Sequence, residues 1–477
     1  MDRRVDVAVV GGGASGTLTA AWLLRLCGHC GPDGFSVALI ERRARAGAGV
    51  AYGTKRPEHL LNVPAGRMSV DPADPFHFVR WARARVRGVS PGAFLQRRLY
   101  GEYLRSFLEV AEQAAPAGAA LVRVRGEAVR IRRRRGGYRV ELGSGDALLA
   151  RWVVLATGNA SPDPLPGIAP ALRARGAVVE EPWRAALDEV PELGTVVLVG
   201  SGLTALDAVA TLRARGHRGK IVAVSRHGLL PKSHLAVAPV RSGGLPRRRT
   251  LRGLLAWLRE SGGAWRAALD AIRPASGELW GGLTRRERAR FLRHLRAHWD
   301  VHRHRAPPSI HAVVRELLEA GRLEVIAGRM VGAVPGRRGM QVRIHKRGEA
   351  RLRSQAAELL VNCTGPSVAG MLGTPLMRGL LEDGLASVDR SGLGLRTQGG
   401  VLVDARGLSA PRLMTVGPLR RAELWETTAI PEIRVQAKEI AERILGRAAT
   451  GHPAALEPRH HLTAPARVRT TAASRSG

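Results

Sequence analysis

The chain has 477 residues, of which 45% are hydrophobic and 24% charged, as expected for a globular protein with two or three domains. Its formal net charge of +35 would suit a nucleic-acid-binding protein, but only five of its 75 basic residues are lysines, and the arginines are spread along the whole chain. We therefore expect no nucleic-acid partner, although the charge favours anionic ligands such as cofactor phosphates and small acidic substrates.

The sequence also argues against a membrane or secreted protein. No segment reaches the roughly 18 uninterrupted apolar residues of a membrane span, and the opening MDRRVDVAVVGGG lacks the apolar core of a signal peptide. The cysteines Cys27, Cys30 and Cys363 are too few for a disulfide framework. We expect a cytoplasmic protein without a membrane partner, and the sequence favours no particular oligomeric state.

The first motif is a glycine-rich turn between a strand and a helix. The apolar run of residues 5–10 leads into Gly11, Gly13 and Gly16, and residues 14–26 read as an apolar helix. In a dinucleotide-binding unit the first glycine makes a tight turn, the second lets the backbone approach a pyrophosphate, and the third allows close helix packing. The N-terminus of the helix, at Ala14 and Ser15, then faces the phosphates.

Two later features extend this site. A second strand, residues 36–40, ends in Glu41, which could accept hydrogen bonds from a ribose, although it follows Gly11 by 30 residues where about 20 is usual. The strand VVLATGN brings a turn at Thr157 and Gly158 toward the dinucleotide.

A second strand-turn-helix unit begins near Thr195. Its turn contains Gly200 and Gly202, followed by Leu203, Thr204 and Ala205, with Ala205 in place of the third glycine. The next strand ends in Ser225 and Arg226 instead of an acid. Because an arginine there can pair with a 2′-phosphate, this site favours NADPH over NADH.

Alternation of strand and helix patterns predicts an α/β protein with two Rossmann-like units. We expect a first part of an FAD-binding domain over 1–165, an NAD(P)H-binding domain over 190–349 with a helical insertion at 247–305, a second FAD part over 350–447, and a disordered tail at 448–477. The tryptophans of the insertion are expected to pack against the parent domain.

Several longer passages carry a family resemblance: AYGTKRPEHLLNVPAGRMSVDPADPFHFVRWA, FLQRRLYGEYL, VGSGLTALDAV, SRHGLLP, WDVHRHR and TVGPLRRAELWETTAIPEIRVQA. In these the chain resembles flavin-containing monooxygenases and amino-acid N-hydroxylases. It is most similar to a bacterial family of FAD/NAD(P)-binding proteins with urate hydroxylase-like and aspartate N-monooxygenase-like members.

The resemblance implies FAD at the first site, NADPH at the second, and a monooxygenase that uses a flavin hydroperoxide to hydroxylate nitrogen or carbon of a small molecule such as an amino acid or a purine, with dioxygen as co-substrate. It implies Asn62 beside the reacting flavin and places Met68, Gly417, Thr427 and Thr428 at the cofactor. Gly417-Pro418 departs from the Gly-Asp of many flavoproteins, and the two threonines could open a helix that faces the flavin.

Other chemistries remain open. Cys27 and Cys30 have the spacing of a thiol redox motif, but they follow a helix, where the dipole opposes thiolate formation. His302 and His304 lie in an arginine-rich string without thiols or carboxylates that would complete a metal site, so we expect no metal. The alternatives are an NADPH-dependent reductase or oxidase without oxygen insertion and a non-catalytic, FAD-bound interaction protein.

Overall fold

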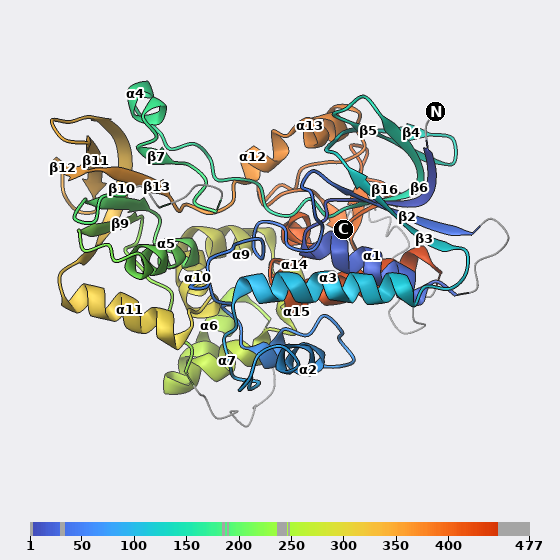
Figure 1. The fold of residues 1–477 in the computed structure, drawn as a ribbon, viewed down its shortest axis with the longest axis horizontal. Helices are drawn as coiled ribbons and strands as arrows, with labels where there is room; N and C mark the ends of the chain where they lie inside the picture. Colours follow the sequence, from blue (N-terminus) through green and yellow to red (C-terminus); the bar gives the residue numbers. More distant parts are fainter. Residues whose placement is uncertain are drawn as a thin grey trace, which may run out of the picture.

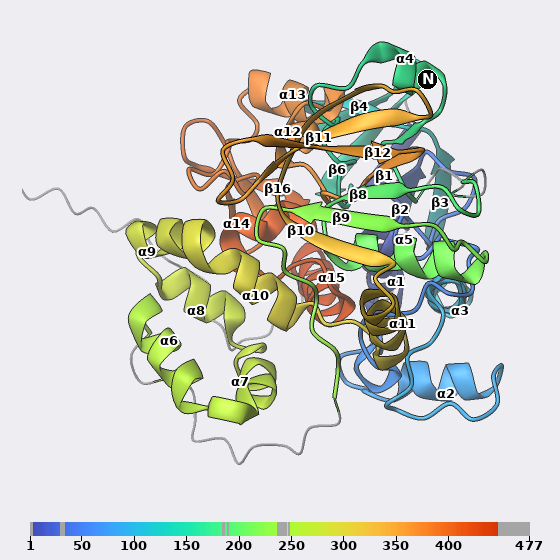
Figure 2. The ribbon, with the colours of Figure 1, turned by 90° about the vertical axis from the view of Figure 1, so that its left-hand side faces the viewer.

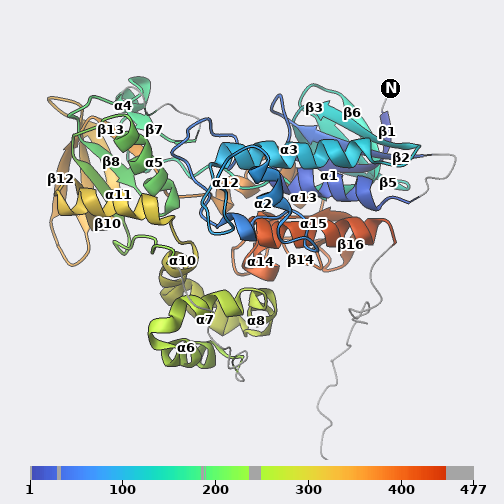
Figure 3. The same ribbon diagram turned by 60° about the horizontal axis from the view of Figure 1, so that its bottom comes forward.

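The computed structural model describes residues 3–28, 34–183, 187, 190–235, 246 and 249–446. Cys30 and the expected tail at 448–477 lie outside these residues. Two sheets stand side by side, and a group of helices extends from one side of them (Figures 1 and 3). None of the described helices is both long and apolar enough to cross a bilayer.

The first sheet is built from β1 (Arg3–Val10), β2 (Phe35–Glu41), β3 (Ala119–Arg125), β4 (Ala128–Arg134), β5 (Gly137–Leu142), β6 (Ala147–Leu155), β14 (Thr397–Gln398), β15 (Val401–Val403) and β16 (Ser409–Thr415). Their order is β14-β15-β16-β6-β1-β2-β3. In addition, β5 pairs with β6 outside this order, and β4 pairs with β5. The central strands β1, β2, β3, β6 and β16 run parallel. Residues 7–10 of β1 are buried because both faces of the sheet are covered.

Helices cover the first sheet on both faces. The alternate side chains of β1 belong to two different cores. One core contains side chains from α1 (Ala14–Leu26), α3 (Arg97–Gln113) and α15 (Ile430–Ile444), and the other contains α13 (Pro375–Glu382) and the β4-β5 hairpin. The period of two in a strand divides its side chains between the two faces in this way.

The second sheet contains β7 (Val178–Val179), β8 (Val196–Val199), β9 (Ile221–Ser225), β10 (Leu323–Pro335), β11 (Met340–Lys346), β12 (Leu352–Ala357) and β13 (Leu359–Asn362). Its order is β12-β11-β10-β9-β8-β13-β7. Strands β7, β8, β9, β10 and β13 pair in parallel, and α5 (Leu203–Ala214) and α11 (Pro308–Glu319) pack on one face. The expected α/β fold with two dinucleotide-type units is confirmed.

One expected boundary was wrong. We expected the second FAD part to begin at residue 350, but β12 and β13 belong to the second sheet, and β13 pairs with β8 through Leu359–Val196 and its neighbours. The apolar run LLVNCTGP completes the second unit, as residues 147–155 complete the first. The chain returns to the first unit only after Asn362, through α12 (Val368–Leu372) and α13.

Helices occupy most of the expected insertion. They are α6 (Leu251–Glu260), η3 (Gly262–Ala264), α7 (Trp265–Ile272), α8 (Ser276–Gly282), α9 (Arg285–Arg290), the π-helical turn η4 (Phe291–Leu295) and α10 (Arg296–Arg303). Figure 2 shows them as a layer of their own beside α14 and α15. Trp280 packs against the parent domain: its ring stacks on Trp425 at 5.1 Å, and its indole N–H donates to the Ala422 carbonyl.

Short elements complete the described chain. They are η1 (Ala65–Arg67), α2 (His77–Arg83), α4 (Pro170–Ala174), η5 (Pro418–Arg420) and α14 (Arg421–Leu424). α14 contacts α8, so it connects the insertion to the C-terminal segment that follows β16.

Candidate functional site

The first glycine turn has the geometry that its motif predicts. Gly11 has φ +106°, and its backbone N–H donates to the Ile40 carbonyl at 2.9 Å. A Cβ on Gly11 would lie 2.5 Å from the Ala156 carbonyl oxygen, and one on Gly16 would lie 1.8 Å from the Gly11 carbonyl oxygen. Both positions therefore require glycine in order to hold β1, α1 and the Ala156 turn together.

Gly13 differs, because no neighbouring atom of the protein requires glycine there. A Cβ there would meet no atom closer than 3.7 Å, the Cα of Gly49. Gly13 is the N-cap of α1, without a side-chain cap and without an acid in the first turn. The N-terminus of α1 is thus open at Gly13, Ala14 and Ser15, and its N–H groups and dipole suit a pyrophosphate.

Glu41, at the end of β2, stands beside this turn. Its carboxylate accepts from the Gly12 N–H at 2.7 Å and from the Arg43 N–H at 2.9 Å. These bonds fix the carboxylate at the mouth of the turn. They leave further lone pairs for ligand hydroxyls.

The C-terminal passage lies against the start of α1. Gly417 has φ +86°, its N–H donates to Gln436 Oε1 at 2.9 Å, and a Cβ there would lie 2.6 Å from Ser15 Oγ. Glycine at 417 therefore lets this loop approach the dinucleotide helix.

The expectation for Thr427 and Thr428 needs a correction. Helix α15 begins at Ile430 with Ala429 as its N-cap, so neither threonine opens it. Thr427 is fully buried, and its hydroxyl has no hydrogen-bond partner among the described residues. Such a buried hydroxyl without a partner is uncommon in protein interiors.

Asn62 lies in the loop before η1, and it lines the same cavity as the first glycine turn. Its carbonyl accepts from His234 Nε2 at 2.9 Å, and burial lowers the pKa of His234 to about 4, so this ring is neutral. Met68 is buried nearby, and its carbonyl accepts from the Tyr100 hydroxyl at 2.8 Å. Backbone contacts therefore hold this loop and leave the Asn62 amide available to a ligand.

The second turn repeats the geometry of the first. Gly200 has φ +116°, and a Cβ there would lie 2.2 Å from the Cys363 carbonyl oxygen. Gly202 is the N-cap of α5 and has open space where a Cβ would be. Leu203 and Thr204 form the first turn of α5, and Ala205 is buried beneath it. This N-terminus is also open to an anionic group.

The end of β9 stands beside this turn. Ser201 Oγ donates to Ser225 Oγ at 2.7 Å and lies 2.6 Å from the Leu229 carbonyl oxygen, which fixes the turn against β9. Arg226 follows Ser225 and is exposed. An exposed guanidinium at this edge is accessible to the phosphate of a bound nucleotide.

A single cavity of about 620 Å³ joins much of the two sites. Of the residues singled out from the sequence, it is lined by Gly11, Gly13, Ala14, Ser15, Glu41, Asn62, Met68, Thr157, Gly158, Leu203, Thr204 and Thr428. The other predicted residues do not line it; they are Gly16, Gly200, Gly202, Ala205, Ser225, Arg226, Gly417 and Thr427. Its size is in the range of about 300–1,000 Å³ that ligand sites have.

The structure adds a buried ion pair that the sequence analysis had not assigned to the site. Arg97 at the start of α3 and Asp207 in α5 line the cavity, and their side chains meet at 2.9 Å. Burial raises the pKa of Asp207 to about 6, against the opposing effect of Arg97. The guanidinium also lies over the Trp183 ring, 5.0 Å from its centroid. No local motif marks this pair, because its members come from two helices that pack on different sheets.

His304 is a second addition. It follows α10 in the passage WDVHRHR and lines the cavity from the side of the insertion. Burial lowers its pKa, so the ring is a neutral hydrogen-bonding group. We had considered His304 only as a metal ligand, and its actual neighbours are charged side chains.

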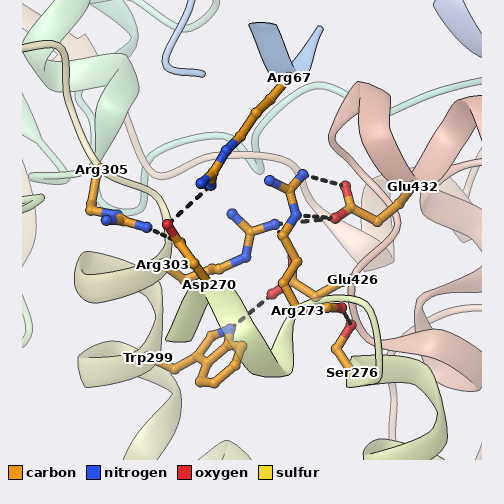
Figure 4. Close-up of polar contacts among 9 residues, drawn as sticks. All are labelled: Arg67, Asp270, Arg273, Ser276, Trp299, Arg303, Arg305, Glu426 and Glu432. Carbon is orange, nitrogen blue, oxygen red and sulfur yellow. Dashed lines mark hydrogen bonds and ion pairs between the residues drawn. The ribbon is translucent and has the colours of Figure 1, made fainter. Parts of the chain in front are cut away.

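Two charged groups near His304, Arg303 and Glu426, belong to a largely buried network between the insertion and the segment around the start of α15 (Figure 4). Glu432, in the first turn of α15, accepts from Arg273 at 2.6 Å and from Arg303 at 3.3 Å. Arg303 also pairs with Glu426 at 3.3 Å, and Trp299 donates to Glu426 at 2.9 Å. Two further arginines, Arg67 and Arg305, pair with Asp270. The network holds the insertion against the loop that precedes α15.

Cys27 stands at the C-cap of α1, as the sequence predicts, and it is buried. Its thiol lies 2.9 Å from the Leu24 carbonyl oxygen. A thiol at the carboxyl end of a helix, beside a carbonyl, is poorly placed to become a thiolate.

Comparisons with known proteins agree with this geometry. A family model described as FAD-NAD(P)-binding matches residues 8–160. No curated protein matches the chain. L-lysine 6-monooxygenase from Pseudomonas syringae is similar in structure, with a TM-score of 0.64 and 17% identity over 93% of this chain and 99% of the other.

Two more solved structures show the range of proteins with this fold. Ornithine N-hydroxylase from Kutzneria sp. 744 has a TM-score of 0.60 and 17% identity over 94% of this chain and 100% of its own. Bacillithiol disulfide reductase from Staphylococcus aureus has a TM-score of 0.56 and 12% identity over 94% and 100%. The two-dinucleotide fold is therefore confirmed, and the activity has to be argued from the site.

Proposed function

We propose that the chain is an FAD- and NADPH-dependent monooxygenase that hydroxylates a nitrogen or carbon of a small molecule such as an amino acid or a purine. The observation that carries this proposal is the single cavity that runs from the turn at Gly13 past Asn62 to the turn at Leu203. A cavity lined by both turns and by an uncharged amide suits two dinucleotides that react with each other and a small substrate.

The first turn would hold FAD. The N-terminus of α1 at Gly13 would bind the pyrophosphate, and Glu41 would accept from ribose hydroxyls. Thr157 and Gly158 would line the dinucleotide from the other side. The second FAD segment would contribute Thr428, which lines the cavity.

The second turn would hold NADPH. The open N-terminus of α5 at Gly202 would bind its pyrophosphate, and Arg226 would pair with its 2′-phosphate. Ser225, fixed by Ser201, would support the ribose side. The Arg97–Asp207 pair lies at the junction, where it would keep the two units in one relative position.

With both cofactors bound, FAD reduced by NADPH supplies an activated form of dioxygen for oxygen transfer. The residues of the chain position the reactants and exclude water. Asn62 would donate a hydrogen bond to the reacting oxygen atoms without adding charge, and the neutral ring of His304 faces the same cavity. The charged side chains of the lining are mixed: Arg42, Arg43 and Arg97 stand with the carboxylates of Glu41, Asp163, Glu181 and Asp207. An anionic group of a substrate would bind at Arg42 or Arg43, since Arg97 is paired with Asp207.

Similarity in fold to a lysine monooxygenase, an ornithine hydroxylase and a disulfide reductase leaves the chemistry to the site. The position of Cys27 beyond the end of α1 disfavours the disulfide chemistry. NADPH consumption measured with and without candidate amines and purines, with peroxide measured in parallel, tests the proposal. A monooxygenase yields hydroxylated product in proportion to NADPH used. An oxidase yields peroxide whatever the substrate, and an interaction protein consumes no NADPH.

A further inference from the structure

The helical insertion contains a second cavity. Its lining shares no residue with the cavity at the two glycine turns, and Trp425 brings it close to the segment before Thr428. It has a volume of about 390 Å³ and is lined by side chains of α6, α7, α8, η4 and α10 and by Trp425. We call it the insertion chamber. Its walls are almost entirely leucine, isoleucine, phenylalanine and tryptophan side chains, which include Trp265, Trp280 and Trp299. These tryptophans line a pocket in addition to packing against other residues.

The chamber is a hollow that is open to solvent on one side, and the α6 side chains that line it are only partly buried. Four leucines, Leu251, Leu254, Leu255 and Leu258, line the chamber from one helix, yet α6 has no buried residue at all. An amphipathic helix normally buries such a face against its neighbours. Here the face borders a hollow of ligand size, which lies within the range of about 300–1,000 Å³ for ligand pockets.

The wall opposite α6 has an irregular backbone. The chain passes from α9 to α10 through the π-helical turn η4, and both Phe291 and Leu295 of that turn line the chamber. Single π-helical turns inside α-helices occur frequently at functional sites, because the extra residue changes where side chains point. The turn therefore shapes the wall where a ligand would lie.

The few polar groups at the chamber are mainly basic. Arg259, His298 and His302 line it together with Ser276, and no carboxylate does. Arg259 is exposed at the end of α6 and forms no ion pair within the described part of the chain. His302 stands edge-on to Trp265 at 4.6 Å. A guanidinium at the rim of an apolar hollow matches a ligand with an apolar body and an anionic head.

We propose that the insertion chamber binds an aliphatic carboxylate of medium chain length, with its hydrocarbon chain among the leucines and tryptophans and its carboxylate at Arg259. This proposal is independent of the oxygenation at the cofactor cavity, because it concerns different residues and is tested by binding alone. An apolar chain gains from leaving water, and the carboxylate gains a charge-assisted contact.

The test uses the purified holoprotein and titration calorimetry with dodecanoate below the concentration at which it forms micelles. We expect saturable binding of one dodecanoate per chain, with quenching of tryptophan fluorescence. Butyrate, which has the same head and little chain, should not bind measurably. Dodecyltrimethylammonium and dodecanol should each bind at least about tenfold more weakly than dodecanoate, which corresponds to a difference of about 1.4 kcal/mol or more in binding free energy. Absence of saturable dodecanoate binding, or equal binding of dodecanol, would overturn the proposal.

Two pairs of variants locate the binding. Leu258→Trp should fill the chamber and weaken dodecanoate binding at least tenfold, whereas Leu318→Trp, on the exposed surface of α11, should leave it unchanged. Arg259→Glu should weaken dodecanoate but not dodecanol, and Arg252→Glu, exposed on the same helix but outside the lining, should affect neither. Because α6 has no buried residue and Leu318 is exposed, these substitutions should spare the fold. Equal effects within either pair would place the binding outside the chamber.

Discussion

Two glycines of the first turn have different reasons for being glycine, and the difference can be tested. Gly16→Val should disrupt the fold, because a Cβ there overlaps the Gly11 carbonyl oxygen. Gly13→Val should fold normally yet bind FAD at least tenfold more weakly, because it loses phosphate contacts of roughly 1.5–3 kcal/mol. Flavin absorbance per chain and circular dichroism measure the two effects. Full FAD occupancy in folded Gly13→Val would show that the pyrophosphate does not bind at this turn.

Asn62 should affect the outcome of the reaction more than cofactor binding. In Asn62→Ala we expect FAD and NADPH to bind as in the parent, since the contact with His234 uses the backbone of Asn62. Loss of a donor at the reacting oxygen atoms costs on the order of 2.7–4 kcal/mol, so more peroxide should be released per NADPH. Asn159→Ala, in the same cavity wall beside Gly158, should stay coupled. Parent-like coupling in Asn62→Ala would place this amide outside the reaction.

Arg226 should discriminate between the two nicotinamide cofactors. Arg226→Asp replaces a phosphate partner by a repelling charge, so the KM for NADPH should rise about tenfold or more while that for NADH changes little. Arg218→Asp is the control, since Arg218 is an exposed arginine before β9, at the opposite end of this strand from Arg226. Steady-state kinetics with both cofactors give the comparison. An equal change in both KM values would show that Arg226 does not contact the 2′-phosphate.

At the scale of elements, the network of Figure 4 fastens the helical insertion to α15. Glu432→Gln leaves Arg273 and Arg303 facing each other without their shared carboxylate. Breaking a buried pair costs about 3–5 kcal/mol, so the urea midpoint of unfolding should fall clearly. Glu442→Gln, on the same helix but paired with Lys438 at 3.7 Å near the surface, should cost less than about 1 kcal/mol. Similar losses in both variants would mean that the network adds no stability.

Elements whose signals are local could be predicted from the sequence. The helix at 14–26 and the turns at Gly11 and Gly200 follow from glycine spacing beside apolar runs, and the structure has them at those residues. The assignment of β12 and β13 to the second sheet could not be predicted, because a buried parallel strand reads the same whichever sheet receives it. Thr427 and Thr428 resemble capping residues in sequence, but the chain reaches helical geometry only at Ile430.

Within the site, long-range contacts were the part that the sequence did not reveal. The Arg97–Asp207 pair joins residues 110 positions apart, and its burial depends on how the two sheets approach each other. His304 was visible as one of several histidines in a basic string. Its neutrality and its place on the cavity wall arise from packing around it, which no spacing rule describes.

At the scale of the whole molecule, the junction between the two units is a small polar core. His59, from the FAD-side unit, bonds Thr54 at 2.8 Å through Nδ1 and Thr211 of α5 at 2.9 Å through Nε2. Its ring stands edge-on to Trp183 at 5.4 Å. Arg97 lies close enough to disfavour a positive charge on this ring. The relative position of the two dinucleotide sites thus depends on a histidine that must remain neutral.

Mild acid should therefore loosen this junction. Burial, assisted by Arg97, lowers the pKa of His59 to about 4, whereas an unfolded histidine titrates near 6.5. Because the folded-state pKa is depressed, the stability from neutral His59 is fully present above about pH 6.5 and is lost as the pH falls toward 4. At about pH 5 the loss is ~2 kcal/mol relative to pH 8.

His59→Gln keeps an amide that can bond Thr211 but cannot titrate. We expect it to be less stable than the parent at pH 8, because packing against Trp183 is lost, yet to lose ~2 kcal/mol less between pH 8 and pH 5. His294→Gln, at an exposed position in η4, should decline in parallel with the parent. Urea unfolding at both pH values gives the four free energies needed for each comparison. If parent and His59→Gln decline by the same amount, the acid sensitivity of the molecule arises elsewhere, and protonation of His59 is not what separates the two units.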